Sequence, residues 1–144
     1  MARNAATKEA LSERLSSAGV KPSRNRILVL EELAREDNDA TAQEIHRRLA
    51  KRDRSVGLAT VYRALSTLSE AGVVDELPHG STETCYRLCG TGHHHHLVCD
   101  GCHRVIELPG CPAKGWIEKR AAEAEFVVTG HRLEARGLCA DCRR

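Results

Sequence analysis

The fold of the first half of the chain is decided by one stretch, Gly57-Leu-Ala-Thr-Val-Tyr-Arg-Ala-Leu-Ser-Thr-Leu-Ser-Glu-Ala-Gly72. Its larger apolar residues recur at the three- and four-residue spacing of one buried helix face: Leu58, Val61, Leu65 and Leu68. Gly72 is a suitable stop for that helix. The opposite face is small and polar apart from Tyr62 and Arg63. Such a helix fits the major groove of DNA, where arginine pairs with guanine and apolar atoms contact thymine methyl groups.

The segments on either side complete a recognisable pattern. Helical periodicity precedes the quoted stretch in three places, over residues 7–18, from near Ser23 and from Thr41. The third of these helices has a clear start, because Thr41-Ala-Gln-Glu44 fits a capping box. The segment that follows the quoted stretch has the pattern of a β-hairpin, with strands at 73–77 and 84–88. These elements predict an α+β chain whose residues 1–88 form an N-terminal winged helix-turn-helix.

Two groups of residues are candidates for contact with double-stranded DNA. Those suited to the phosphate backbone or the minor groove lie near the start of the second helix: Lys21, Arg24 and Arg26. Those suited to base edges lie on the quoted helix: Thr60, Tyr62 and Arg63. The formal net charge is only +2, so any nucleic-acid contact must come from local clusters of this kind. The alternative interpretation is a small helical lobe with a solvated polar face.

Composition limits the remaining possibilities. The chain of 144 residues is 41% apolar but only 3% aromatic, so its packing must rest on aliphatic side chains and a second source of stability. No apolar run approaches the ~20 residues that span a bilayer. The first residues lack the apolar stretch of a secretory signal. We therefore expect a soluble, cytoplasmic protein with no membrane partner.

The cysteines indicate metal binding in the second half of the chain. All seven lie after residue 84, and in a reducing compartment clustered thiols indicate metal ligation before disulfides. Two CxxC pairs offer the four thiolates of a closed structural zinc site: Cys99, Cys102, Cys139 and Cys142. A thioredoxin-like redox role lacks its βαβ setting.

Thirty-six residues separate the two CxxC pairs, enough for a helix and several strands. We expect the helix at 112–125 and the strands at 105–108, 126–128 and 131–138. Residues 89–144 are therefore predicted to form a small α/β lobe with a four-cysteine zinc site.

A run of four histidines, His93 to His96, leads into the first CxxC pair. If the run is extended, alternate side chains face opposite ways, so His93 and His95 serve one site and His94 and His96 another. A surface loop with casual metal affinity is the alternative. Cys89 favours a genuine site, because a thiolate beside imidazoles suits zinc. His131 would by default be an ordinary core or surface imidazole, and Cys111 is not assigned by its spacing.

These motifs together resemble the ferric uptake regulator family of metal-responsive bacterial repressors. Gly19-Val-Lys-Pro-Ser-Arg-Asn-Arg-Ile-Leu28 is similar to the family's first DNA-side segment, and residues 57–72 are similar to its recognition helix. With the histidine run and both CxxC pairs, the resemblance covers essentially the whole chain. It implies an N-terminal winged helix, a hinge and a C-terminal α/β dimerisation lobe. It also implies a homodimer that binds operator DNA when a regulatory metal is loaded.

Within the family, four consecutive histidines preceded by a cysteine look like the zinc uptake regulator branch. The iron branch usually carries His-His-Asp-His instead. The resemblance implies a regulatory hinge site formed by Asp75, Cys89, His94 and His96. It places His93, His95 and His131 in a further site of the dimerisation lobe.

The further site departs from the family pattern. It normally takes a glutamate fifteen residues after the first CxxC cysteine, where this chain has Lys114. A protonated ammonium cannot ligate a metal. The site is therefore lost, three-coordinate with water, or completed by a nearby group such as Cys111.

The sequence thus predicts a zinc-responsive repressor of zinc homeostasis genes that is not an enzyme. The leading alternative is a relative in the same family that senses iron, manganese, nickel or peroxide. A zinc-dependent hydrolase would need an open coordination position and a general base, and the chain has no His-Glu-x-x-His motif. A zinc store would explain the histidines and cysteines but not the helix that carries Tyr62 and Arg63.

Overall fold

The computed structural model describes residues 6–36, 38–79, 83–88, 90 and 92–144. The chain divides into two compact units, Met1–Cys89 and Gly90–Arg144, here called the first and second units. Among the residues that the structure describes, no helix combines the length and the apolar character needed to cross a membrane.

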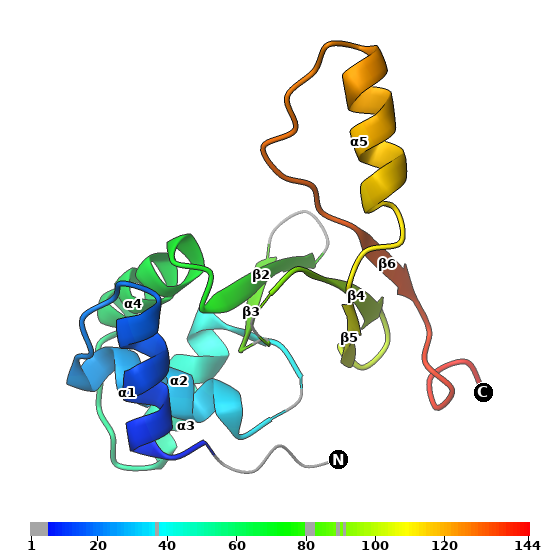
Figure 1. Cartoon of the computed structure of the whole chain (residues 1–144). Coiled ribbons are helices and arrows are strands. Elements are labelled where there is room, and N and C mark those ends of the chain that lie inside the picture. Colours follow the sequence, from blue (N-terminus) through cyan, green and yellow to red (C-terminus); the bar gives the residue numbers. More distant parts are fainter. Residues whose placement is uncertain (1–5, 37, 80–82, 89, 91) are drawn as a thin grey trace. The chain divides into compact units, whose positions relative to one another are not determined.

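The first unit is a winged helix built from four helices and a three-stranded sheet (Figure 1). In chain order its elements are α1 (Lys8–Ser17), α2 (Arg24–Ala34), β1 (Ala40–Thr41), α3 (Ala42–Lys51), α4 (Leu58–Glu70), β2 (Val74–His79) and β3 (Glu83–Leu88). The sheet order is β1-β3-β2, and both pairings are antiparallel. β2 and β3 form the predicted wing, and α4 is the helix predicted from residues 57–72.

The helices begin and end where the local sequence supplies a cap. The N–H of Glu44 donates to Thr41 Oγ1 at 3.2 Å, and the N–H of Thr41 donates to Glu44 Oε2 at 2.8 Å. The predicted capping box of α3 is thereby confirmed. Gly19 and Gly72 have φ of +75° and +70°, the left-handed conformation that ends α1 and α4 as predicted.

The core of the first unit is aliphatic, as the scarcity of aromatic residues requires. Its fully buried side chains come from all four helices and from the strands: Leu11, Leu15, Val29, Leu30, Ile45, Leu49, Val61, Leu65, Leu68, Val74 and Leu77. The prediction for Leu58 is wrong, because it begins the first turn of α4 and is 37% exposed. Tyr86 is the one aromatic residue among the described core members.

The second unit contains β4 (His94–Cys99), β5 (Val105–Pro109), α5 (Lys114–Glu123) and β6 (Glu134–Gly137). β4 is the central strand of the order β5-β4-β6, antiparallel to β5 and parallel to β6. The register pairs His95 with Leu108 and Cys99 with Gly137. The histidine run is therefore extended, and the first CxxC pair lies at the end of the same strand.

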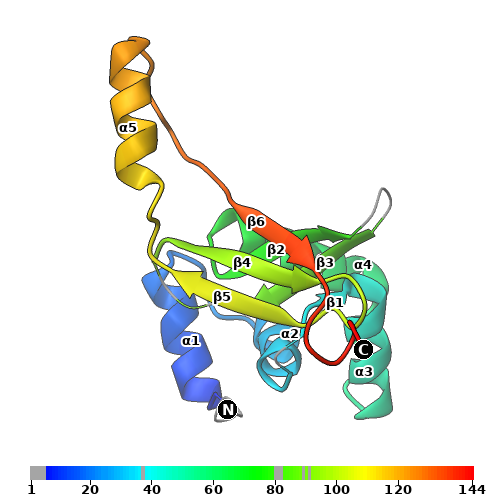
Figure 2. The same ribbon diagram turned by 90° about the vertical axis from the view of Figure 1, so that its right-hand side faces the viewer.

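The second unit buries little apolar surface. None of the residues of α5 is buried, and both views draw this helix apart from the three-stranded sheet (Figures 1 and 2). The prediction of a strand at 126–128 is wrong: these residues have no regular structure, and Phe126 and Val127 are 69% and 82% exposed. Of the strand predicted at 131–138, only Glu134–Gly137 pairs with a neighbour. β-Branched residues favour strands only where a partner strand packs against them, and 126–128 has none among the described residues.

Candidate metal centres and nucleic-acid interface

Four cysteines from the two CxxC pairs come together at one end of the second unit's sheet. Cys99 ends β4, Cys102 lies in the turn after it, and Cys139 and Cys142 follow β6. Their sulfur atoms all lie within 4.8 Å of one another. The parallel pairing of β4 with β6 accounts for this arrangement, because it brings the carboxyl ends of both strands to the same edge. Four converging thiols match the ligand set of a tetrahedral structural zinc site.

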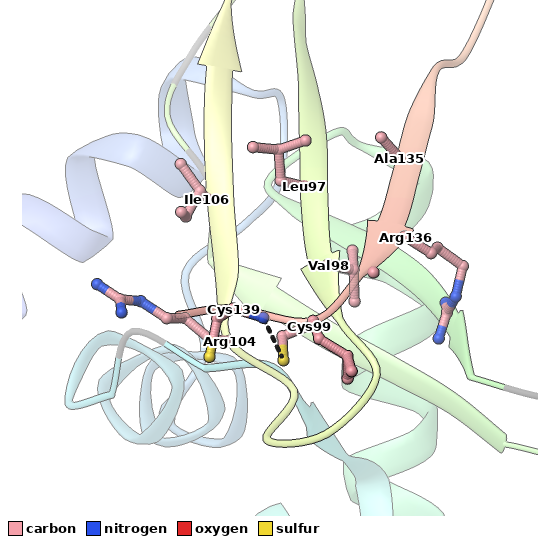
Figure 3. Close-up of a pocket in the computed structure, with 10 residues that line it drawn as sticks. Leu97, Val98, Cys99, Arg104, Ile106, Ala135, Arg136 and Cys139 are labelled. Atoms are coloured by element: carbon pink, nitrogen blue, oxygen red, sulfur yellow. Dashed lines mark hydrogen bonds between the residues drawn. The ribbon is translucent and has the colours of Figure 1, made fainter. Parts of the chain in front are cut away.

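Backbone amides prepare this cluster for a cation. The N–H of Cys139 donates to Cys99 Sγ at 3.3 Å, the bond drawn dashed in Figure 3. This hydrogen bond is the main cause that lowers the pKa of Cys99 to about 6. Hydrogen bonding with Cys139 and then Cys102 raises the pKa of Cys142 to about 12. The thiolate of Cys99 thus forms readily, whereas the raised pKa of Cys102 and of Cys142 opposes their ionisation. A bound divalent cation would stabilise these thiolates.

Close packing defines the wall of the four-cysteine cluster. A Cβ atom at Gly101 would lie 2.8 Å from Cys142 Sγ and 2.9 Å from Cys142 Cβ, so only glycine fits there. Leu97 and Ile106 line an apolar pocket that also reaches Cys99 and Cys139 (Figure 3). The cluster therefore has a closely approaching backbone at Gly101 and adjoins an apolar pocket at Cys99 and Cys139.

A second cluster joins three imidazoles and a thiol. His93 Nε2 lies 3.3 Å from His95 Nε2 and 3.0 Å from His131 Nε2, and Cys111 Sγ lies 3.0 Å from His131 Nε2. One ligand atom from each of the four residues lies within 4.8 Å of the others. The structure thus brings together the residues predicted for the further site, with Cys111 in place of the expected glutamate.

His95 is the buried member of this second cluster. It is 3% exposed, and its Nδ1 has no hydrogen-bond partner among the described residues. Burial lowers the pKa of His95, and the neighbouring His93 and His131 lower it further. The neutral imidazole that results is the form that binds metals.

The predicted hinge residues are divided between the units. His94 and His96 belong to β4, with ring centroids 5.0 Å apart and nearly perpendicular planes. Asp75 belongs to β2 of the first unit, and Cys89 lies outside the described residues. The four-ligand hinge site therefore stays a prediction. What the structure does establish is the grouping of the imidazoles: His93 lies with His95 in one cluster, and His94 lies beside His96.

The outward face of α4 has the composition expected of a DNA-reading helix. Tyr62 is 43% exposed, Arg63 is exposed, and an N–H of Arg63 donates to Thr60 Oγ1 at 3.1 Å. Near the start of α2, the guanidinium of Arg26 donates to the carbonyl of Lys21 at 2.7 Å. Of the residues predicted to contact phosphates, Lys21 and Arg24 are exposed and Arg26 is half-buried, and their roles stay predictions.

The sequence did not assign a role to two residues of the metal clusters, Cys111 and Gly101. Cys111 has no spacing rule of its own, because the register of β4 with β5 and the turn at Gly110 place it. Gly101, between Cys99 and Cys102, was not predicted to constrain the cluster, although a glycine inside a CxxC pair can indicate that another backbone or side chain approaches closely.

Comparison with known proteins agrees with this geometry. Residues 17–136 match the sequence profile of the ferric uptake regulator family. The zinc uptake regulation protein of Mycobacterium tuberculosis is 38% identical over 129 residues, which are 90% of this chain and 99% of that protein. The ferric uptake regulation protein of Escherichia coli strain K12 is 34% identical over 132 residues, 90% of this chain and 89% of that protein.

Among solved structures, a zinc uptake regulator complexed with zinc and DNA is similar at a TM-score of 0.76 and 27% identity. The similarity covers 94% of this chain and 92% of that chain. The family resemblance carried by the two CxxC pairs, the histidine run and the α4 sequence is confirmed. The chain belongs to the ferric uptake regulator family, whose members are transcription regulators and not enzymes.

Proposed function

We propose that this chain is a zinc-responsive transcriptional repressor that binds operator DNA as a metal-loaded homodimer and controls zinc homeostasis genes. The observation that carries the proposal is the segment formed by His93 and strand β4, which groups His93 with His95, places His94 beside His96 and ends in the four-thiol cluster. Imidazole and thiolate donors suit zinc, whereas manganese prefers oxygen donors. The similarity to zinc uptake regulators supports the same choice.

Homodimerisation is supported by the uncovered apolar surface of the second unit. Trp116 is 65% exposed, Phe126 69%, Val127 82% and Leu138 57%. Large apolar side chains are rarely left in contact with water in a single folded chain unless a partner covers them. A second copy that buries these residues would also set the spacing of two α4 helices, which must meet major grooves one DNA turn apart.

The regulatory step is assigned to Asp75, Cys89, His94 and His96. A carboxylate, a thiolate and two imidazoles are a donor set that zinc accepts. Held by one ion, these residues would tie the DNA-reading unit to the second unit. Released, the linker around Gly90 and Gly92 would let the two units move independently. The apparent affinity for the operator would then fall with the fraction of dimers in the competent arrangement.

The main alternative is a relative that responds to iron, manganese, nickel or peroxide. The 34% identity to the Escherichia coli ferric uptake regulation protein shows that family membership alone does not choose the metal. The choice depends on the ligands, and a thiolate in the regulatory site favours zinc over manganese or iron(II).

The decisive experiment measures operator affinity against buffered free zinc, iron(II) and manganese. A duplex selected from random DNA by the zinc-loaded chain serves as the operator. Half-maximal binding is expected at a far lower free concentration of zinc than of the other two metals. Tightest binding at the lowest free iron(II) or manganese would reject the zinc assignment.

The same assay on four variants tests the ligand assignment. Cys89→Ser and His94→Ala should abolish zinc-dependent binding while dimerisation and the four-cysteine zinc persist. His93→Ala and His95→Ala should only shift the zinc concentration required or the maximal affinity, because their side chains face the other cluster. If His93→Ala silences the response while His94→Ala leaves it intact, the hinge mechanism is wrong.

A further inference from the structure

The second cluster of the second unit brings together four potential metal ligands, one of which is not part of the family pattern. We propose that Cys111 supplies a thiolate which, with His93, His95 and His131, forms a four-coordinate site for zinc and zinc-like divalent ions. Lys114 takes no part in this site. The inference rests on the geometry of the second unit and not on the proposed response to zinc at the operator.

The turn after β5 delivers Cys111 to the imidazoles. β4 and β5 pair His94 with Pro109, so the chain leaves the sheet beside the first histidines. Gly110, at φ +75°, reverses the chain, and its N–H donates to the carbonyl of His93 at 3.3 Å. This bond holds the residue before Cys111 against His93, at the start of the strand that carries His95. The thiol is thus placed by backbone register and not by chance surface contact.

The donor atoms are crowded in a way that a cation would relieve. His93 Nε2 faces two other Nε2 atoms at 3.0 and 3.3 Å, and a single N–H on His93 can donate to only one of them. The Cys111 thiol can donate its proton to His131 Nε2 across 3.0 Å. Once this thiol is ionised and each ring carries its proton on Nδ1, all four atoms present a lone pair to the same point. His95 is almost completely buried, whereas His93 lies at the surface and His131 and Cys111 are half-buried. A divalent ion accepts all four lone pairs at once.

Lys114 is occupied elsewhere. Its Nζ lies 3.9 Å from a carboxylate oxygen of Glu118, one turn further along α5. Both side chains are exposed, and a protonated ammonium has no lone pair to offer a metal. The residue that the family pattern aligns with a metal-binding glutamate therefore has a surface role in this chain, and Cys111 takes over the ligand role three residues earlier.

The donor set defines which ions the site takes. Three neutral imidazoles and one thiolate form a four-coordinate nitrogen and sulfur environment, which suits zinc and its spectroscopic substitute cobalt(II). Manganese prefers six oxygen-rich ligands, and iron(II) commonly binds with carboxylate. The apolar residues Leu108, Pro109 and Leu133 lie beside His95 and Cys111. They offer no oxygen ligand from their side chains to a six-coordinate ion.

Cobalt(II) titration of the full-length chain tests this site in isolation. The Cys89→Ser variant is used as background, with zinc retained in the four-cysteine cluster. Cys111 is then the remaining thiol apart from Cys85, which is buried in the first unit. We expect a sulfur-to-cobalt charge-transfer band at about one ion per chain. The band should be lost when Cys111→Ser is added and kept when Cys85→Ala is added instead.

Two further arms separate the possible outcomes. Cys111→Asp should still bind a metal, but its preference for zinc over manganese should fall because an oxygen donor replaces sulfur. A charge-transfer band that survives Cys111→Ser, or that never forms in the Cys89→Ser background, overturns the proposal. Both results are independent of operator binding, because Cys89→Ser already removes the proposed regulatory site.

A measurement on the unsubstituted cysteine covers the case in which Cys111→Ser fails to fold. Zinc should slow alkylation of Cys111 by iodoacetamide, read by peptide mass mapping, since a coordinated thiolate is a poor nucleophile. We expect at least about tenfold protection. His131→Ala should abolish the protection, whereas His46→Ala, which removes a histidine on α3, should retain it. Equal protection in His131→Ala and in the parent chain overturns the ligand set.

Discussion

Two cysteines of this chain show how strongly the surroundings of a thiol control its pKa. Cys85, on β3, is 2% exposed, and burial followed by the nearby Asp39 raises the pKa of its thiol to about 12. Cys99 accepts a backbone N–H, and the pKa of its thiol is lowered to about 6. The first is an inert packing element, and the second is ready to bind a cation.

Cys85 should make the first unit less stable at alkaline pH. The unfolded chain ionises this thiol near its ordinary pKa of 9.0, whereas the folded chain keeps it protonated up to a pKa of about 12. Its contribution to the free energy of unfolding is therefore intact below pH 9 and is lost as the pH rises from 9 toward 12. Between about pH 8 and pH 10 the parent chain should lose roughly 1 kcal/mol more than Cys85→Ala.

The test is denaturant unfolding of both proteins at these two pH values. Effects of all other titrating groups cancel in the comparison, because only residue 85 differs. Parallel losses in the two proteins would contradict the burial of Cys85 as an uncharged thiol.

Arg63 and Arg26 should differ in what they contribute to DNA binding. Arg63 lies on the exposed face of α4, and its loss is expected to cost about 1–3 kcal/mol at a specific site and to blur preference at particular base pairs. Arg26 lies at the start of α2, and its loss should weaken binding to all sequences alike. The salt dependence should then flatten by about one unit of slope.

Titrations of Arg63→Ala and Arg26→Ala with operator and with random duplex, over a range of salt, separate the two roles. If both substitutions affect specific and random DNA equally, α4 does not read bases through Arg63.

Among the elements, β4 carries the most chemistry for its length. Its six residues include three of the four consecutive histidines and end at Cys99, a member of the four-cysteine cluster. The alternation of side chains along the strand places His95 in one group of imidazoles and His94 with His96 in another. A period of two is a property of any extended strand, so the sequence alone was sufficient to separate His93 and His95 from His94 and His96.

Other elements could not be predicted from local pattern. Thr41 and Glu44 specify the start of α3 by themselves, because a cap depends only on adjacent residues. Phe126 and Val127 have the composition of a strand but stay exposed, and we propose that a second copy covers them. Local sequence does not distinguish such residues from core residues. Cys111 reaches His131 only through the tertiary register of β4 and β5, which its own neighbours do not encode.

Gly101 should limit how well the four-cysteine element holds its metal. A methyl group at this position would lie 2.8 Å from Cys142 Sγ, so the sulfur must move for alanine to fit. Gly101→Ala should therefore release zinc about 10- to 100-fold faster. The rate of zinc transfer to a coloured chelator measures this.

Gly137→Ala is the matched control. A Cβ atom there would meet no heavy atom of the described chain within 4 Å, although Gly137 pairs with Cys99 in the same sheet. Equal rates for the two variants would show that the close approach at Gly101 does not constrain the cluster.

At the scale of the whole molecule, the two units are stabilised by different means. The first unit has an aliphatic core assembled from four helices, whereas the second unit has few buried apolar residues, Val98 and Val105 among them. Its stability must come from bound metal and from the surface that we propose a second copy covers.

Cys102→Ser should therefore disrupt the second unit and spare the first. We expect loss of zinc from the four-cysteine cluster together with a fall in molecular mass from dimer to monomer. Metal analysis and sedimentation measure these two changes, and fluorescence of the single Trp116 reports on α5. Asp141→Asn, an exposed non-ligand in the second CxxC pair, is the control. A Cys102→Ser protein that stays dimeric with normal tertiary structure would contradict the prediction that this zinc stabilises the second unit.

The parallel pairing of β4 with β6 also has a consequence for how the chain tolerates change in length. A metal held by both CxxC pairs closes a loop of thirty-six residues. Helix α5 and the segments on either side of it form most of this loop. The entropy of closing such a loop grows only with the logarithm of its length, about 0.6 kcal/mol for each doubling. Insertions between Ala124 and Gly130 should therefore cost little folding free energy. Lengthening the turn between Cys99 and Cys102 would separate the ligands themselves.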